Sequence, residues 1–270
     1  MERLLLVDFM FLWNRIFYVS SGDYYERVMK VIEKLHNSNY YSKKIIVLDG
    51  KNGTNKHKAL LEDYKAGRSD KTEVYSQIDL FIKEASDKYS SVMFVRGDDY
   101  EADEVITNFI PLYNRKYEVY IYSGDKDLIQ LLRYNNVFIG DRYHRGIELI
   151  PWTREEALGK FEKATGGRLD NFVDLVKFRA FRGDSSDNIP AAIPRITSAK
   201  IFELIENCWK DNTLTPSTTS NIMNYVKGTS LEDKMVQGIK DLERNWKLMY
   251  LSNANYEQVL KNTKRLTICK

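Results

Sequence analysis

The sequence predicts an α/β protein: a mostly parallel sheet flanked by helices, followed by a helical region. Over the first 150 residues, short apolar runs alternate with amphipathic stretches, which is typical of parallel sheets covered by helices on both faces. After about residue 150 the strand pattern stops and only helical periodicity continues. We therefore expect a sheet-based domain at residues 1–150 and a helical domain at residues 151–270.

Five short segments have the composition of buried strands, because each is apolar, partly β-branched and bounded by turn residues. They are Arg3–Asp8, Lys44–Asp49, Val92–Arg96, Tyr117–Tyr122 and Val137–Ile139. The N-terminal run also resembles a short signal-peptide core, but Asp8 interrupts it and no small-residue cleavage site follows. A buried strand that ends in a functional acid explains this stretch better.

Helices are predicted where apolar residues repeat at helical spacing. These segments are 28–35, 74–85, 172–176, 201–208 and 235–249. Thr153 and Glu156 form a capping box that opens a further helix. The Thr/Ser-rich stretch Asp211–Ser220 is expected to be an exposed loop.

The composition excludes two classes of protein and points toward a third. Cys208 and Cys269 are too few for a disulfide framework, which suits a reducing cytoplasm. No segment approaches the ~20 uninterrupted apolar residues of a membrane span. The net charge is only +3, yet basic residues concentrate in the segment 56–71. Alone, this segment would be read as a solvated helix face, but beside an acidic pocket it suits an enzyme that acts on a polyanion.

Nine acidic residues gather in five short groups along the chain. They are Asp8; Asp49; Glu101, Asp103 and Glu104; Asp125 and Asp127; and Asp184 and Asp187. Each group alone has a structural explanation, since an acid after a strand often caps the next helix and acids favour the first turn of a helix. If the strands are parallel, however, the first four groups converge on one edge of the sheet, where ligands bind in such folds.

Clustered carboxylates destabilise a fold unless cations compensate their charge. Oxygen ligands select hard cations such as Mg²⁺ or Mn²⁺, and two cations about 4 Å apart can catalyse phosphoryl displacement. The sequence offers no strong competitor. The three histidines lack zinc-like spacing, and neither a phosphate-binding loop nor a nucleophile elbow is present.

The ordered motifs resemble the 5′-nuclease family, which includes flap endonucleases and the 5′→3′ exonucleases of bacteriophages and of DNA polymerase I. The resemblance extends from Leu4 to about Leu204. The matching motifs are Leu4–Asp8 with Arg15, Tyr64–Arg68, Tyr100–Glu104, Ser123–Leu128 and Gly183–Pro190. It implies a PIN-like core, a helix-three-turn-helix DNA-binding element and a helical arch near residues 52–77.

The resemblance also implies a role for each site residue. One metal ion would be held mainly by Asp8, Asp49, Glu101 and Asp103, with Glu104 and Asp125 adjacent, and the other by Asp125, Asp127, Asp184 and Asp187. Lys65 and Arg68 would be catalytic, acting on the scissile phosphate, whereas Arg15 and Tyr64 would bind substrate. The implied cofactor is Mg²⁺, replaceable by Mn²⁺, in two or more ions.

The implied activity is 5′→3′ exonuclease and flap endonuclease cleavage of DNA by a monomeric enzyme without a membrane partner. RNA-primer removal, RNA–DNA hybrid substrates and replication proteins as partners stay open. Two alternatives also remain: a PIN-type ribonuclease, and a non-catalytic DNA-binding protein. The acid pair in the helical half argues against the first, and the complete acidic set argues against the second.

Two positions depart from the family pattern. Glu104 stands where the family usually has Asp. The stretch Pro190–Lys200 contains no glycine, although the family's DNA-binding hairpin is glycine-rich. Side chains and prolines should impair a backbone phosphate cradle and a monovalent-cation site there, so Arg195 and Lys200 are predicted to contact the duplex instead. Thr197 and Ser198 could cap the next helix. The other interpretation is a purely structural loop.

Overall fold

The computed structural model describes residues 1–19, 22–67, 72–144, 147–167, 171–254 and 256–266. The chain divides into two compact units. The sheet unit comprises Met1–Asn55, Ser69–Trp152 and Leu251–Lys270, and the helical unit comprises Lys56–Arg68 and Thr153–Tyr250. This division differs from a single boundary near residue 150, because one segment from each side crosses into the other unit. Within the described ranges, no helix has the length and apolarity needed to cross a bilayer.

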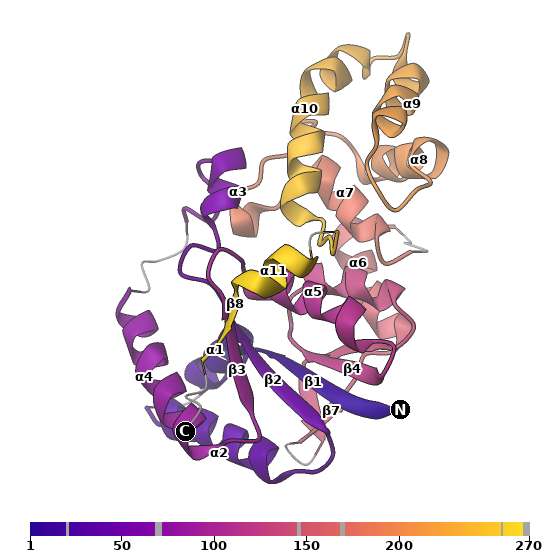
Figure 1. Cartoon of the computed structure of the whole chain (residues 1–270). Helices are drawn as coiled ribbons and strands as arrows, with labels where there is room; N and C mark the ends of the chain where they lie inside the picture. The colour runs from indigo at the N-terminus through magenta and orange to yellow at the C-terminus, as the bar shows by residue number, and fades with distance from the viewer. Residues whose placement is uncertain (20–21, 68–71, 145–146, 168–170, 255, 267–270) are drawn as a thin grey trace. The chain divides into compact units, whose positions relative to one another are not determined.

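The sheet unit is built on a six-stranded sheet with the order β5-β4-β1-β2-β3-β8 (Figure 1). Five strands run parallel: β1 (Glu2–Asp8), β2 (Lys43–Leu48), β3 (Met93–Gly97), β4 (Tyr117–Tyr122) and β5 (Val137–Gly140). Leu4, Leu5, Leu6 and Val7 of the central strand β1 are all fully buried. Burial on both faces explains why this strand is continuously apolar rather than alternating.

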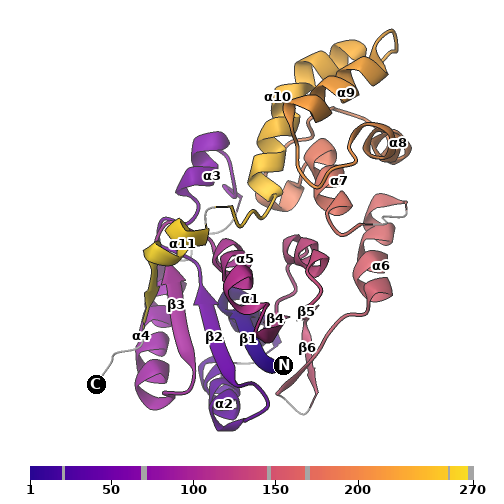
Figure 2. The same cartoon turned by 45° about the vertical axis from the view of Figure 1, so that its right-hand side comes forward.

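Helices cover both faces of the sheet (Figure 2). On one face, α1 (Phe9–Val19), α2 (Tyr24–Asn37) and α4 (Thr72–Lys88) enclose a core that includes Trp13 and Phe81. On the other face, α5 (Ala102–Tyr113) packs across four strands, with α11 (Tyr256–Asn262) beside it. A 3-10 helix, η1 (Asp127–Arg133), follows β4. The predicted PIN-like α/β class is therefore confirmed.

Three short strands were not predicted. β6 (Arg142–His144) and β7 (Glu148–Ile150) form a separate antiparallel hairpin. The expectation that no strand follows residue 150 is wrong, because β8 (Thr263–Arg265) pairs antiparallel with β3. Its three residues are polar and lack apolar alternation, so its pairing depends on backbone hydrogen bonds that leave no hydrophobic pattern.

The helical unit contains α6 (Arg154–Thr165), α7 (Asp174–Arg182), α8 (Ser198–Cys208), α9 (Pro216–Val226) and α10 (Glu232–Met249). It also contains the short 3-10 helix η2 (Ser185–Asp187) and most of α3 (Asn55–Leu60). Its own core includes Phe181, Ile193, Leu204, Ile222 and Leu242, all fully buried. The predicted capping box of α6 is present, since Thr153 Oγ1 accepts from Glu156 N at 3.0 Å and Thr153 N donates to Glu156 Oε2 at 2.8 Å.

The prediction of an exposed loop at Asp211–Ser220 is wrong for its second half, because Pro216–Ser220 forms the first part of α9. Thr215 caps this helix by accepting a hydrogen bond from Thr218 N at 3.2 Å. Proline is favourable in the first turn, where its missing N–H has no intrahelical partner. The Thr, Ser and Pro residues that suggested a loop instead mark the start of α9.

Candidate functional site

Two acids lie at the carboxyl edge of the sheet. Asp8 is the last residue of β1, and Asp49 directly follows the adjacent strand β2. Asp8 accepts hydrogen bonds from Phe11 N at 3.1 Å and from Ser123 Oγ at 2.9 Å. Asp49 accepts from Ala102 N at 2.8 Å and so connects β2 to the start of α5.

The pKa of the Asp8 carboxyl is raised, in part by the neighbouring acids. Burial raises its pKa most, and the charges of Asp49 and Asp125 raise it further, whereas the Phe11 and Ser123 hydrogen bonds lower it. The resulting pKa is about 7. Like charges that share a partly dry site favour the protonated form of one of them. The acids after β1, β2 and β4 therefore form one electrostatic cluster, as the parallel topology predicted.

The third acidic group begins α5. Glu101 is the N-cap residue, and its backbone N–H donates to Glu104 Oε2 at 3.0 Å. Asp103 accepts from Glu104 N at 2.7 Å. These acids thus satisfy the N-terminus of the helix, where the dipole favours negative charge. These acids can cap the N-terminus of α5 and also bind a metal ion, since each carboxylate has a second oxygen.

The fourth group follows β4 across a tight turn. Ser123 Oγ accepts from Asp125 N at 3.1 Å, and Asp125 Oδ1 accepts from Asp127 N at 2.9 Å. The turn needs glycine at position 124, because a Cβ there would lie 2.4 Å from the Phe11 ring. The sequence analysis included Ser123 in a matching motif but assigned it no role, whereas in the structure it links Asp8 to the backbone of Asp125.

The donor set fits a hard divalent cation. Every candidate ligand at this edge is a carboxylate oxygen, the type that Mg²⁺ and Mn²⁺ prefer. Burial and, after it, the charges of Asp49 and Asp125 raise the pKa of Asp8, and a bound cation would favour its ionised form. Among the described residues, no three Asp, Glu, His or Cys side chains are already arranged as a metal-binding group.

The fifth acidic group belongs to the helical unit. Asp184 forms an ion pair with Arg179, and it accepts hydrogen bonds from Ser186 N at 2.9 Å and Ser186 Oγ at 2.7 Å. Asp187 is buried at the end of η2. Gly183, with φ of +78°, allows the chain to turn tightly against Ile189. These internal contacts hold in place the loop that bears the Asp184 and Asp187 carboxylates.

The segment that carries Tyr64 and Lys65 packs on this acidic loop. Lys65 N donates to Asp187 O at 3.0 Å, and Asn188 Nδ2 donates to Asp63 O at 3.2 Å. Lys65 adopts φ of +56°, an unusual conformation for a side-chain-bearing residue. Tyr64 is buried in the core of the unit, so its place is structural as well as near the candidate site. Arg68 lies outside the described residues.

His57 was given no role in the sequence analysis, because the histidines lack zinc-like spacing. It is buried and packs on the Tyr64 ring with centroids 4.9 Å apart. Burial lowers its pKa most, and the charges of Lys56 and Lys65 lower it further, to about 4. His57 is therefore neutral at physiological pH and contributes packing without adding charge beside Lys65.

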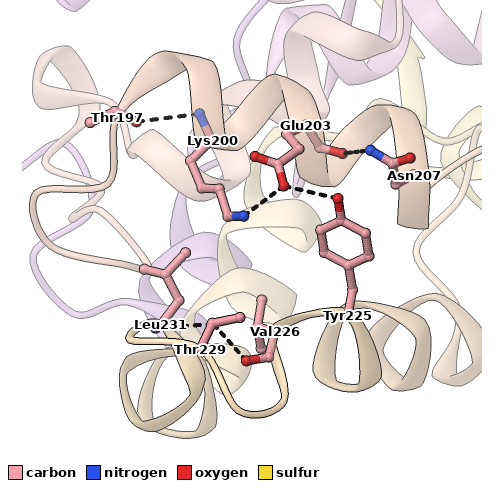
Figure 3. Close-up of polar contacts among 8 residues, drawn as sticks. All are labelled: Thr197, Lys200, Glu203, Asn207, Tyr225, Val226, Thr229 and Leu231. Carbon is pink, nitrogen blue, oxygen red and sulfur yellow. Dashed lines mark hydrogen bonds and ion pairs between the residues drawn. The ribbon is translucent and has the colours of Figure 1, made fainter.

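The predicted substrate-binding residues lie in different surroundings. Arg15 is exposed on α1, with its guanidinium 5.8 Å from the centre of the Phe11 ring. Arg195 is exposed and adopts φ of +61°. Lys200 instead pairs with Glu203 at 2.7 Å within the helical unit (Figure 3). The predicted cap of α8 is present, because Thr197 Oγ1 accepts from Lys200 N at 3.3 Å.

The loop without glycine before α8 is well packed. Ala192 and Ile193 are buried in the helical core. Arg182 fixes the end of the loop by donating to Ile196 O at 3.1 Å and to Ser198 Oγ at 2.9 Å. Apolar side chains that anchor the loop thus stand where the family pattern has glycine, while Arg195 remains exposed.

The PIN-like α/β fold, with acids gathered at the carboxyl edge of its sheet, places the chain in the general class of PIN-like proteins. Comparisons with known proteins then identify its family. Residues 3–161 match the 5′-3′ exonuclease, N-terminal resolvase-like domain. The 5′-3′ exonuclease of Bacillus subtilis is 32% identical over 196 residues, which are 70% of this chain and 58% of that protein. That of Mycoplasmopsis pulmonis is 30% identical over 199 residues, 70% of this chain and 61% of that protein. The chain belongs to the 5′-3′ exonuclease family.

Solved structures share the fold. The T5 5′-exonuclease bound to divalent zinc ions has a TM-score of 0.69 and 17% identity, with 97% of this chain and 93% of that chain covered. A bacteriophage T5 flap endonuclease complex with DNA and metal ions has a TM-score of 0.66 and 18% identity, with 97% and 93% covered. The chain spans a little over half the length of the curated 5′-3′ exonucleases it matches, from 54% to 61%.

Proposed function

We propose that the chain is a divalent-metal-dependent 5′-nuclease that hydrolyses phosphodiester bonds at 5′ ends and 5′ flaps of DNA. The observation that carries this proposal is the carboxylate cluster at the sheet edge, where burial and the charges of Asp49 and Asp125 raise the pKa of Asp8 to about 7. Membership of the 5′-3′ exonuclease family supports the reaction class. The divalent ions in the T5 5′-exonuclease structure support the metal requirement.

In this proposal the nine carboxylates hold two or more Mg²⁺ ions. Asp8, Asp49, Glu101 and Asp103 would hold one ion, with Glu104 and Asp125 adjacent. Asp125, Asp127, Asp184 and Asp187 would hold the other. When bound, such a pair of ions supplies an activated water and stabilises the departing 3′-oxygen. Ser123 keeps the first set in register by bonding both Asp8 and the Asp125 backbone.

The basic residues would act on the substrate rather than on the ions. Lys65, with Arg68, would stabilise charge that develops on the scissile phosphate. The hydrogen bond from Lys65 N to Asp187 O fixes the backbone of this lysine to the acidic loop. Arg15 would position the DNA backbone. We further propose that residues 52–77 form an arch, that residues 151–250 grip duplex DNA, and that the enzyme works in the cytoplasm as a monomer.

The proposal is tested by digesting a 5′-flap DNA in Mg²⁺, beside a matched single-stranded RNA and an RNA-primed duplex. We expect cleavage of the DNA that leaves a 5′-phosphate and stops in EDTA. Preferential RNA cleavage would indicate a PIN-type ribonuclease. DNA binding without cleavage in Mg²⁺ or Mn²⁺ would indicate a non-catalytic binding protein. The relative rates on flap, 5′ end and primer settle the balance of activities.

A further inference from the structure

A second concave site lies in the helical unit, between the end of α8 and one face of α9. Its volume is about 600 Å³, within the range of small-ligand pockets. The lining is polar: three carboxamides from Asn207, Asn221 and Asn224 are joined by Lys210, Asp211 and Tyr225. None of these residues belongs to the acidic motifs or to the loop before α8.

The chemistry of the lining indicates the kind of ligand. Lys210 and Asp211 carry opposite charges on neighbouring residues, so the lining as a whole is neutral and does not select its ligand by net charge. One carboxylate is too few to hold a divalent cation. Carboxamides both donate and accept hydrogen bonds without charge. The side chains of Asn221 and Asn224 make no hydrogen bond to another residue within the described ranges, so both amides are open to a ligand.

The side chain of Tyr225, which forms one wall of the pocket, is held in place by contacts with α8. The phenol of Tyr225 donates to Glu203 Oε1 at 2.9 Å, and Lys200 bonds the same carboxylate at 2.7 Å (Figure 3). Lys200 Nζ also lies 5.4 Å from the centre of the Tyr225 ring. These contacts hold the aromatic plane in place, yet Tyr225 remains 41% exposed. A ring that is exposed but already held in place can stack on a ligand and loses little further side-chain entropy on binding.

We propose that this pocket binds a nucleobase, which stacks on Tyr225 and is read by the carboxamides of Asn221 and Asn224. Adenine fits best, because an Asn carboxamide can both accept from its N6 and donate to its N7. Lys210 would then neutralise the attached phosphate. The same chemistry is offered by a free nucleotide and by an unpaired base in a DNA strand. The inference is independent of the proposed nuclease activity, since it concerns binding without metal.

The test measures equilibrium affinity in EDTA by titration calorimetry, with dAMP as the free nucleotide and a short oligodeoxyadenylate as the strand. Tyr225→Leu should weaken binding about ten-fold, because base–aromatic stacking is lost. Tyr225→Phe keeps the ring and should retain most of the affinity. Asn221→Ala should weaken binding about three- to ten-fold.

Ser220→Ala is the matched control, since Ser220 is exposed on α9 but does not line the pocket. Binding of dAMP as tight as that of the oligonucleotide would identify a free nucleotide as the ligand, and much tighter binding of the oligonucleotide would identify an unpaired base. Affinities that do not change in Tyr225→Leu and Asn221→Ala would overturn the proposal. Absence of binding to both probes would overturn it as well. Cleavage of flap DNA would be a separate result and would test only the proposed function.

Discussion

Replacing Asp8 by asparagine should stabilise the metal-free protein at alkaline pH. The pKa of Asp8 is raised from 3.8 to about 7, so the folded protein holds a proton that the unfolded chain has released between these values. Stability therefore falls as pH rises from about 4 to about 7 and stays lowered above that. The carboxamide of the variant cannot ionise, yet its Oδ1 can still accept from Phe11 N.

The raised pKa corresponds to at most ~4 kcal/mol of lost stability above neutrality. Asp8 is only half-buried, and water reaching the carboxyl reduces this to about 1–2 kcal/mol. For a chain of this size, we expect the thermal midpoint of Asp8→Asn to exceed that of the unmodified protein by about 2–6 °C at pH 8.5 in EDTA. At pH 5 the difference should shrink to roughly a third, because most of the titration lies above that pH.

Differential scanning calorimetry at the two pH values provides the measurement. Asp87→Asn is the control, because Asp87 is exposed on α4 of the same unit, away from the acidic cluster; it should change the midpoint little. Millimolar Mg²⁺ should raise the midpoint of the unmodified protein more than that of Asp8→Asn, since the variant lacks a ligand. A variant that is less stable than the unmodified protein by the same amount at both pH values would refute this reasoning.

The remaining predictions concern catalysis and DNA binding. Asp125→Asn should lose nearly all turnover in Mg²⁺ yet keep DNA affinity; a variant with a tenth of the normal kcat would contradict its place between two ions. Lys65→Ala should slow single-turnover cleavage by orders of magnitude with little effect on affinity, and the reverse pattern would make Lys65 a binding residue only. Arg195→Ala should lower the salt slope of duplex binding by about one, whereas Lys200→Ala should lower it less, because Glu203 already pairs with this lysine. Exchanging Na⁺ for K⁺ at constant ionic strength should change duplex affinity little, and a strong K⁺-specific gain would contradict the absence of a cation site in the loop before α8.

The sheet and its acidic edge were predictable because each depends on a local pattern and one topological rule. Continuous apolar runs marked β1, β2 and β4, and parallel strands bring the residues after them to one edge. Pairings between distant segments were not predictable. The contact of Lys65 with the Asp187 loop is made by backbone atoms, and the hydrogen bond from Tyr225 to Glu203 joins two different helices. Neither leaves a periodic trace in the sequence.

The position of β8 bears on how this protein forms during synthesis. β3 leaves the ribosome long before Thr263–Arg265, so its outer edge stays unpaired while the intervening helices emerge. Thr153–Tyr250 is one continuous stretch that supplies most of the core of the helical unit, so this part of the chain has emerged before β8 is made. The sheet unit is completed last, when β8 pairs with β3 and Lys264 bonds Asp98 at the end of that strand. A nascent chain stalled before this point would present an open strand edge, which is the state most exposed to misassociation.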